Sequence, residues 1–535
     1  MNALYRVDYK QLQLRPHQSH EGTCEWLYRD TIFQSWSSFK ASAILWLSGQ
    51  AGVGKSVLTR RLVEDTLAGS PSLPLPNELL VASYFCSYNE ASVNSEETVL
   101  RSLLHQVVQV NPLCRNVVSL QLQKRTLRVL EYDLSLNKLW TAFREVLALG
   151  SMRRTLICLD SVEELPTQSA VGLLKGLSGI INALSVSHPS HQIRVFISSR
   201  HVSEFSEALS SSFSLRISPC HVQHDIENFV AGSIDQFAEE HPGFAAAVGS
   251  FKKHQITRKI VERANGMFLW ANIALENFKR GLLWNRDIVD RKFRELDELQ
   301  PGLNDLYANM ISKVDSSIHD DMFAIFLVIA TAERPLNQHE LGILLAIQYS
   351  DRRISYSSEI QPFLDLENVI ENNFPDLLSI DDGHNITFVH LSFKEYLYHH
   401  WDQMDSEWHF KARRKIAMSC MVYLNLRELV RCAKRERNME GEILLYLYFI
   451  NLPIGSPFAD LSKESASTIV FRFSAMRPDS SFVTYIRYRP TMSIGCILLT
   501  WAVTTAYSIQ TGESSIQHWI MPWKPNFMSV RYSTL

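Results

Sequence analysis

One stretch of this chain decides its fold: it reads AILWLS at residues 43–48 and continues as GQAGVGKS at residues 49–56. The first part is a continuous apolar run, which is typical of a strand buried on both faces of a parallel sheet. The second part has the pattern G-x-x-x-x-G-K-[ST], and Val57–Leu67 after it has the composition of a helix. Strand, glycine-rich loop and helix in this order predict a phosphate-binding loop, or P-loop.

The residue types of the loop predict its chemistry. A triphosphate needs several backbone N–H groups aimed at its oxygens, and Gly49, Gly52 and Gly54 leave room for that approach. We expect Lys55 to neutralise the β- and γ-phosphates and the Ser56 hydroxyl to ligate Mg²⁺, next to the positive end of the helix. The predicted nucleotide-binding residues are Gly49, Gln50, Ala51, Gly52, Val53, Gly54, Lys55, Ser56 and Val57.

A second motif places acids after an apolar run. Residues 155–160 read TLICLD, and SVEE follows at 161–164. An acid at the carboxyl end of a buried strand can hold Mg²⁺ through water, which is the role expected for Asp160. We expect Glu164 to orient and polarise the attacking water, with Glu163 as a further candidate for the magnesium shell. The alternative is a strand-ending aspartate followed by a solvated acidic turn.

A third motif, IRVFISSR at residues 193–200, is another apolar run. It predicts a strand that ends just before Arg200 and so presents a guanidinium at the carboxyl edge of the sheet, where ligands bind in α/β folds. Arg200 could reach a γ-phosphate there and report its presence. The alternative is a surface arginine behind an edge strand.

The first 220 residues alternate apolar runs with amphipathic segments, after a helical lead over about residues 20–40. Alternation of this kind predicts a three-layer α/β/α core with a mostly parallel sheet, the fold class of P-loop NTPases. Beside the strand at residues 43–47, the predicted strands are Leu79–Cys86, Thr155–Leu159, Ile193–Ile197 and Ser214–Ile217. Beside the helix after the P-loop, the predicted helices are Glu96–Val110, Leu139–Leu149 and Val171–Leu184.

From about residue 221 the pattern is helical. Helices are expected at Asp225–Phe237, Gln255–Arg263, Met267–Lys279, Asn304–Val314, Met322–Ala332, Gln338–Leu345, Ser392–Tyr398, Ile416–Leu426 and Gly441–Ile450. Leu377–Ile380 and Asn385–Val389 flank the turn Asp381-Asp382-Gly383 and predict a two-stranded wing. The expected domains are a helical lead (1–40), a P-loop core (41–220), a helical domain (221–317), a winged-helix-like domain (318–410) and a mostly helical segment of unknown role (411–535).

The composition is that of a packed globular protein: 535 residues, 46% of them hydrophobic and 20% charged, with a net charge of -3. This balance gives no electrostatic reason to expect binding to nucleic acid or to an anionic membrane. None of the eight cysteines forms a C-x-x-C pair, which favours free thiols in a reducing compartment. Met1–Gln18 lacks the apolar region of a secretory signal, and Ser, Thr and Gly interrupt the apolar run Met492–Ile509. We therefore expect a cytoplasmic protein.

Taken in order, these motifs resemble the NACHT family of STAND-class P-loop NTPases. The nearest likeness is to fungal NACHT proteins whose P-loop module is similar to the N-terminal domain of nephrocystin-like proteins. The likeness spans roughly residues 20–425. Beside the P-loop, it is carried by TCEWL at 23–27, DSVEE at 160–164, SSR at 198–200, GMFLW at 266–270, ERPL at 333–336 with EL at 340–341, and VHLSFKEY at 389–396.

The resemblance implies a switch that binds ATP or ADP with Mg²⁺ and hydrolyses ATP slowly at most. It implies that His390 contacts the β-phosphate of bound ADP and holds a closed state, whereas the residues alone also allow a structural histidine. It places Phe268 where related switches put a proline against the adenine. Exchange of ADP for ATP would then control conformation and self-association.

Departures from the family pattern leave an alternative open. Glu163 stands where the family has a second aspartate, and its extra methylene could shift the magnesium geometry. The stretch before residue 20 is too short for an effector domain, and no sensing repeats are recognisable after residue 425. The alternative is a non-catalytic scaffold locked on its nucleotide, or a degenerate, truncated paralogue. A small-molecule kinase is weaker, because no arginine-rich lid is visible.

Overall fold

The computed structural model describes Leu4, residues 18–75, 79–88, 94–125, 130–132, 134–281, 283–332, 334–350, 352–381, 383–424 and 426–427, and three short strands beyond them. These strands are β11 (Val470–Arg472), β12 (Val483–Arg487) and β13 (Met528–Arg531). The chain divides into two compact units, Met1–Ser312 and Lys313–Leu535, and each is described by itself.

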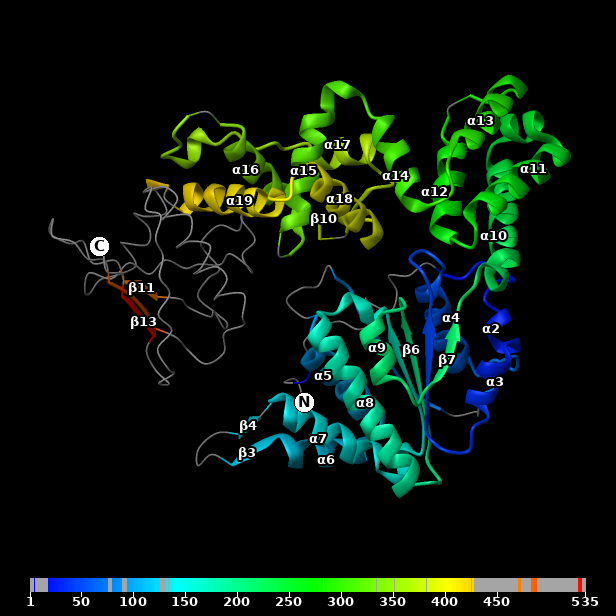
Figure 1. Ribbon diagram of the computed structural model, residues 1–535, viewed down its shortest axis with the longest axis vertical. Helices are drawn as coiled ribbons and strands as arrows, with labels where there is room; N and C mark the ends of the chain where they lie inside the picture. The colour runs from blue at the N-terminus through cyan, green and yellow to red at the C-terminus, as the bar shows by residue number, and fades with distance from the viewer. Residues whose placement is uncertain are drawn as a thin grey trace. The chain divides into compact units, whose positions relative to one another are not determined.

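The first unit contains the predicted α/β core, built on a five-stranded sheet in the order β2-β5-β6-β1-β7 (Figure 1). All of its pairings are parallel. β1 lies between β6 and β7, so the loop after β1 begins at the carboxyl edge of the sheet, beside the end of β6. The strands are β1 (Ala43–Ser48), β2 (Leu80–Phe85), β5 (Arg154–Asp160), β6 (Gln192–Ser199) and β7 (Phe213–Arg216), and all five were predicted.

Helices cover both faces of this sheet, because right-handed crossovers place the helix after β1 opposite those that follow β2, β5 and β6. Figure 1 shows α5 and α8 together on one side. On that side Trp46 and Ile197 belong to the same buried cluster as Leu173 of α8. The helices of the core are α4 (Lys55–Ala68), α5 (Glu96–Val110), α6 (Pro112–Leu122), α7 (Leu136–Leu147), α8 (Thr167–Ser187) and α9 (Ser203–Ala208).

The helical lead is broken into two helices, α2 (Trp26–Arg29) and α3 (Thr31–Ser37). Asp30 causes the break, because it is extended and its carboxylate accepts the N–H groups of Ile32 and Phe33 as the N-cap of α3. Trp36 of α3 is fully buried and donates its indole N–H to the carbonyl of Ala43, at the start of β1. The lead therefore packs on the first strand of the core.

One described helix, α8, is long and apolar enough to cross a membrane by length and composition alone. Its apolar side is already occupied within the first unit. Leu173, Leu174 and Leu177 are fully buried in the cluster that covers the sheet. The packing of α8 against the sheet thus accounts for its hydropathy.

Four helices and strands of the core were not predicted: α6, α9 and the hairpin of β3 (Gln123–Arg125) with β4 (Leu130–Tyr132). Cys114, Val118 and Leu122 are buried at helical spacing along α6. Pro112, its first residue, suits a helix start. A three-residue strand is too short to leave a periodic pattern in the sequence.

The rest of the first unit is helical, as predicted. It contains α10 (Pro219–Glu240), α11 (Pro242–Ala264), α12 (Phe268–Lys279), α13 (Arg286–Glu298) and α14 (Leu303–Ser312). α11 starts earlier than predicted and is kinked at Gly249, whose φ of 59° is non-helical. α13 was missed because its sequence is strongly charged, and among its residues only Val289 and Leu296 are buried.

The second unit contains α15 (His319–Thr331), α16 (Gln338–Gln348), α17 (Leu366–Asn373), α18 (Leu391–Met404) and α19 (Trp408–Leu424). The predicted hairpin pairs β9 (Leu378–Ile380) with β10 (Asn385–Phe388), antiparallel. The expectation of two strands was wrong, because β8 (Leu336–Asn337) pairs with the other side of β10. The winged-helix assignment itself stays a prediction, as do the domain boundaries.

Some predictions lie outside the described residues. They concern the helix at Gly441–Ile450, the apolar run Met492–Ile509, Glu333 and Asp382. Within the described part of the chain the six cysteines are free, and all but Cys220 are buried. That part also holds no cluster of three His, Cys, Asp or Glu residues suited to a metal ion.

Candidate functional site

The predicted P-loop connects the end of β1 to the start of α4. Gly49 donates its N–H to the carbonyl of Ser199 at 3.1 Å, which ties the loop to the end of β6. Gly52 and Gly54 have φ angles of 73° and 89°, a left-handed region that side chains with a Cβ disfavour. The two glycines are therefore required by the backbone path that takes the loop from the strand into the helix.

Lys55 is buried at the first position of α4 and curls back over the loop. Its ammonium donates to the carbonyls of Gly49 at 3.0 Å and of Gln50 at 2.9 Å. Burial lowers the pKa of Lys55, and the nearby carboxylate of Glu163 acts in the opposite direction. A buried cation over a glycine-rich loop suits an anionic ligand.

Asp160, the last residue of β5, is buried among hydroxyl groups. Its Oδ1 accepts from Thr59 at 3.0 Å and from Ser198 at 2.5 Å, and its Oδ2 accepts from Ser161 at 3.0 Å. The Ser161 hydroxyl in turn lies 3.2 Å from that of Ser56. The two residues predicted to hold Mg²⁺ are thus linked through one serine.

Glu163 lies close to both Lys55 and Arg200. The Oε1 atom of Glu163 is 3.8 Å from the Lys55 ammonium and 3.7 Å from Nε of Arg200. Burial raises the pKa of Glu163, and the charge of Lys55 lowers it. The other oxygen, Oε2, is buried and has no hydrogen-bond partner among the described residues. A buried carboxylate oxygen without a donor suits a magnesium ion or a water held by one.

Glu164 is held by a different part of the chain. Its Oε2 accepts the N–H of Tyr88 at 3.0 Å, and Asn94 donates to its carbonyl oxygen at 2.5 Å. Burial raises the pKa of Glu164 to about 8, with the neighbouring Glu163 and Asp160 adding to the rise. The two adjacent glutamates lie in a short helical turn that follows Ser161, whose φ is 52°, and they contact different partners.

The start of α12 covers the outside of the P-loop. Leu269 donates its N–H to the carbonyl of Gly52 at 3.0 Å. A Cβ at Gly54 would lie 3.3 Å from the ring of Phe268. The sequence pattern pointed to Phe268 only through a family likeness, and it gave no sign of the Leu269 contact, because the two segments are more than 200 residues apart.

Of the remaining predicted residues, Gln50 is exposed, Val53 is buried, and Ala51, Ser56 and Val57 are half-buried. His390 belongs to the second unit, where it precedes α18. Its Nδ1 accepts the N–H of Ser392 at 3.0 Å and so caps that helix. The structure thus brings together Lys55, Ser56, Asp160, Glu163 and Arg200. In the second unit, His390 caps the N-terminus of α18.

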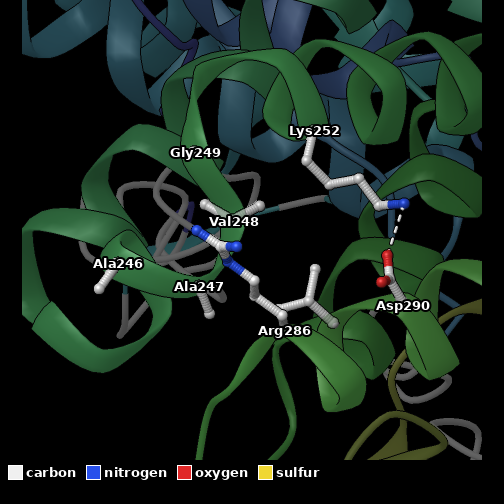
Figure 2. Close-up of a pocket in the computed structure, with 8 residues that line it drawn as sticks. Ala246, Ala247, Val248, Gly249, Lys252, Arg286 and Asp290 are labelled. Carbon is white, nitrogen blue, oxygen red and sulfur yellow. Dashed lines mark ion pairs between the residues drawn. The ribbon is translucent and has the colours of Figure 1, made fainter.

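A separate hollow of about 260 Å³ lies between α11 and α13, at the kink of α11 (Figure 2). It shares no residue with the P-loop. The charge of Lys252 is compensated there by Asp290 at 2.8 Å. Its lining consists of Ala246, Ala247, Val248, Gly249, Lys252, Arg286, Val289 and Asp290. Nothing in its chemistry connects it to the nucleotide site.

Two comparisons of sequence find relatives of this chain. Residues 22–200 match the family model described as nephrocystin 3, N-terminal. The chain is also 24% identical over 326 residues to the vegetative incompatibility protein HET-E-1 of Podospora anserina. That match covers 60% of this chain and 22% of the relative, so the chain spans about a fifth of the length of the protein it matches.

Solved structures give more distant likenesses. A signal transduction ATPase with numerous domains (STAND) and a tetratricopeptide repeat sensor from Pyrococcus horikoshii is 12% identical, with a TM-score of 0.36, over 79% of this chain and 47% of that one. The Orc1 protein of Aeropyrum pernix, solved in complex with DNA, is 13% identical, with a TM-score of 0.28, over 73% and 96%. The identities and TM-scores of both likenesses are low, and the fold class rests on the parallel sheet and the P-loop.

Proposed function

Because this chain is a NACHT-like protein of the STAND class, with a nephrocystin-like P-loop module, we propose that it is a signalling switch controlled by a bound purine nucleotide. One observation carries the proposal. Lys55 of the P-loop and Arg200 both lie within 4 Å of Glu163, and Asp160 is bonded to Thr59 of the helix that follows the loop, at the carboxyl edge of a parallel sheet. Nucleotides bind at this edge in α/β folds, and these charges are what a triphosphate with Mg²⁺ requires.

Each residue has a proposed task. The loop N–H groups from Gln50 to Lys55 hold the phosphate oxygens, and Lys55 turns from the loop carbonyls toward the β- and γ-phosphates. Ser56 and Asp160 hold Mg²⁺, directly or through water, since both supply the oxygen ligands that this ion prefers. Bound Mg²⁺ would neutralise phosphate charge. Arg200 contacts the γ-phosphate when this group is present, and Phe268 forms a wall of the nucleotide pocket beside Gly54.

The switch itself follows from differential binding. A nucleotide shifts a conformational equilibrium only if it binds the two states with different affinity. We propose that ADP stabilises a closed state, with His390 contacting its β-phosphate, and that ATP releases that state and promotes self-association. A cytoplasmic location is part of this proposal.

Slow hydrolysis fits the local chemistry of Glu164. A carboxyl group with a pKa of about 8 is mostly protonated at neutral pH, and a protonated acid cannot accept a proton from water. Its oxygen is also engaged by the N–H of Tyr88. The same observation supports the second candidate, a scaffold that binds nucleotide without turnover. ATP hydrolysis by Asp160→Asn equal to that of the native protein would favour the scaffold.

Equilibrium binding of ATP and ADP to Lys55→Ala tests the assignment of the P-loop. We expect a loss of at least about tenfold in affinity for both nucleotides, because a charged contact to phosphate contributes more than 1.4 kcal/mol. Lys175→Ala, on α8, is the control with the same change of charge. Unchanged tight binding by Lys55→Ala would exclude the proposed site.

A further inference from the structure

Glu163 is the acid closest to the two cations of the site, and it contacts them in an unusual way. Its Oε1 is 3.8 Å from Nζ of Lys55 and 3.7 Å from Nε of Arg200. Both distances exceed those of hydrogen bonds, so the carboxylate compensates the charge of the two cations without accepting a hydrogen bond across either distance. Its side chain is only 9% exposed, so water screens this interaction poorly.

The second oxygen of Glu163 has unused capacity. Oε2 is buried and accepts no hydrogen bond from the described residues. Leaving a buried acceptor unpaired is costly, so a side chain in this position is poised to gain a partner or to move. The neighbouring Glu164 differs, because its Oε2 is already bound to the N–H of Tyr88.

The cations that Glu163 compensates are the ones that a γ-phosphate would need. A carboxylate and a γ-phosphate cannot both lie between Lys55 and Arg200 without repulsion, unless another cation separates them. We propose, building on the function proposed above, that Glu163 determines which nucleotide state the site accepts. Its carboxylate takes the place of the γ-phosphate charge when that phosphate is absent, and Mg²⁺ allows both anions to be present.

This role has a consequence that a purely structural residue would not have. The native protein binds ADP in the absence of a divalent cation, because Arg200 keeps its carboxylate partner. ATP without Mg²⁺ must displace Glu163 and binds more weakly. Removing the charge, with the shape kept, lifts this penalty and leaves the site with an excess of positive charge.

The test is a titration of fluorescent N-methylanthraniloyl derivatives of ATP and ADP, with EDTA and with Mg²⁺. For Glu163→Gln we expect the affinity for metal-free ATP to rise about tenfold, which corresponds to 1.4 kcal/mol, and the affinity for ADP to rise less. For Glu163→Asp, which keeps the charge on a shorter side chain, the affinity for metal-free ATP should lie between those of the native protein and of Glu163→Gln. Glu145→Gln, an exposed acid on α7, controls for net charge and should change neither affinity.

An affinity for metal-free ATP in Glu163→Gln that is unchanged or lower would overturn the proposal. Glu163→Asp decides the matter if Glu163→Gln does not fold, because an affinity for metal-free ATP equal to that of the native protein would then overturn it. Lys55→Met distinguishes a failure of the proposed nucleotide site from a failure of the role proposed for Glu163. If the native protein binds neither derivative, the proposed nucleotide site fails, and the role of Glu163 fails with it. The same holds if Lys55→Met binds both derivatives as tightly as the native protein does. If only the Glu163 variants behave like the native protein, the nucleotide site stands and the role of Glu163 does not.

Discussion

Leu269 donates its backbone N–H to the carbonyl oxygen of Gly52 at 3.0 Å, so the first turn of α12 is bonded directly to the P-loop. The Cβ of Leu269 also lies 2.7 Å from the position that a Cβ on Gly52 would take. Any change in the path of the P-loop must therefore be accommodated by α12. This contact gives a bound nucleotide a direct mechanical connection to the helical segment of the first unit.

Gly52→Ala tests that connection. The substitution places a Cβ against Leu269 and also imposes a left-handed backbone on alanine, which costs about 1–2 kcal/mol. We expect a lower melting temperature and weaker nucleotide binding. Leu269→Gly in the same chain removes the clash and keeps the N–H donor, so it should recover part of the loss. Strictly additive effects of the two substitutions, within about 0.5 kcal/mol, would show that the contact does not matter.

Glu164 predicts a pH dependence of stability. Burial raises its pKa from 4.5 to about 8. Between pH 4.5 and about pH 8, the folded protein therefore keeps a proton on Glu164 that the unfolded chain has lost. The free energy of unfolding of the native protein therefore falls as the pH rises through this window, by up to about 1.4 kcal/mol per pH unit. Glu164→Gln has no such proton. Its melting temperature should rise relative to that of the native protein from pH 5 to pH 8, and a constant difference would contradict the assignment.

Arg194 is a structural arginine in the middle of β6, only 1% exposed. Its guanidinium donates to the carbonyls of Ala41 at 2.7 Å, of Ser37 at 3.3 Å, and of Phe39, and so closes the loop between α3 and β1. Arg194→Met leaves these carbonyls without donors, at about 1–3 kcal/mol for each one that water cannot reach. Thermal melting should show a marked loss of stability for Arg194→Met and almost none for the exposed control, Arg154→Met. Equal shifts would contradict this role.

Glu340 predicts a separate weakness in the second unit. Its side chain is fully buried at the start of α16, and Arg334 binds both of its oxygens at 2.8 Å. Arg334→Ala leaves a buried carboxylate without its counter-charge, for which about 3–5 kcal/mol is typical. Limited proteolysis should therefore cleave residues 313–427 faster in this variant than in Arg353→Ala, which removes an exposed charge. Identical cleavage rates would show that the pair contributes little.

Much of the core could be predicted from the sequence, because buried parallel strands are continuous apolar runs and the P-loop has its own spacing. β1, β5 and β6 were found in this way. Asp160 ends β5, Arg200 follows β6, and Lys55 follows the loop after β1. The charged helix α13 and the two-residue strand β8 were missed. Neither has enough buried residues to produce a pattern.

The orientation of the two glutamates could not be predicted. Glu163 and Glu164 are adjacent in a single short helical turn after the left-handed Ser161, yet one contacts Lys55 while the other contacts Tyr88. The roles predicted for Asp160, Glu164, Arg200 and His390 stay predictions. Residue types identify which chemistry is present, whereas the direction of each side chain depends on contacts between segments far apart in the chain.

The most direct test of the switch is the identity of the nucleotide that remains bound to protein purified without added ligand. The protein is denatured, and the released nucleotide is identified by chromatography. We predict close to one equivalent of ADP from the native protein and almost none from Lys55→Ala. Native protein that is folded but releases no purine nucleotide, or Lys55→Ala that retains the same amount, would contradict the account.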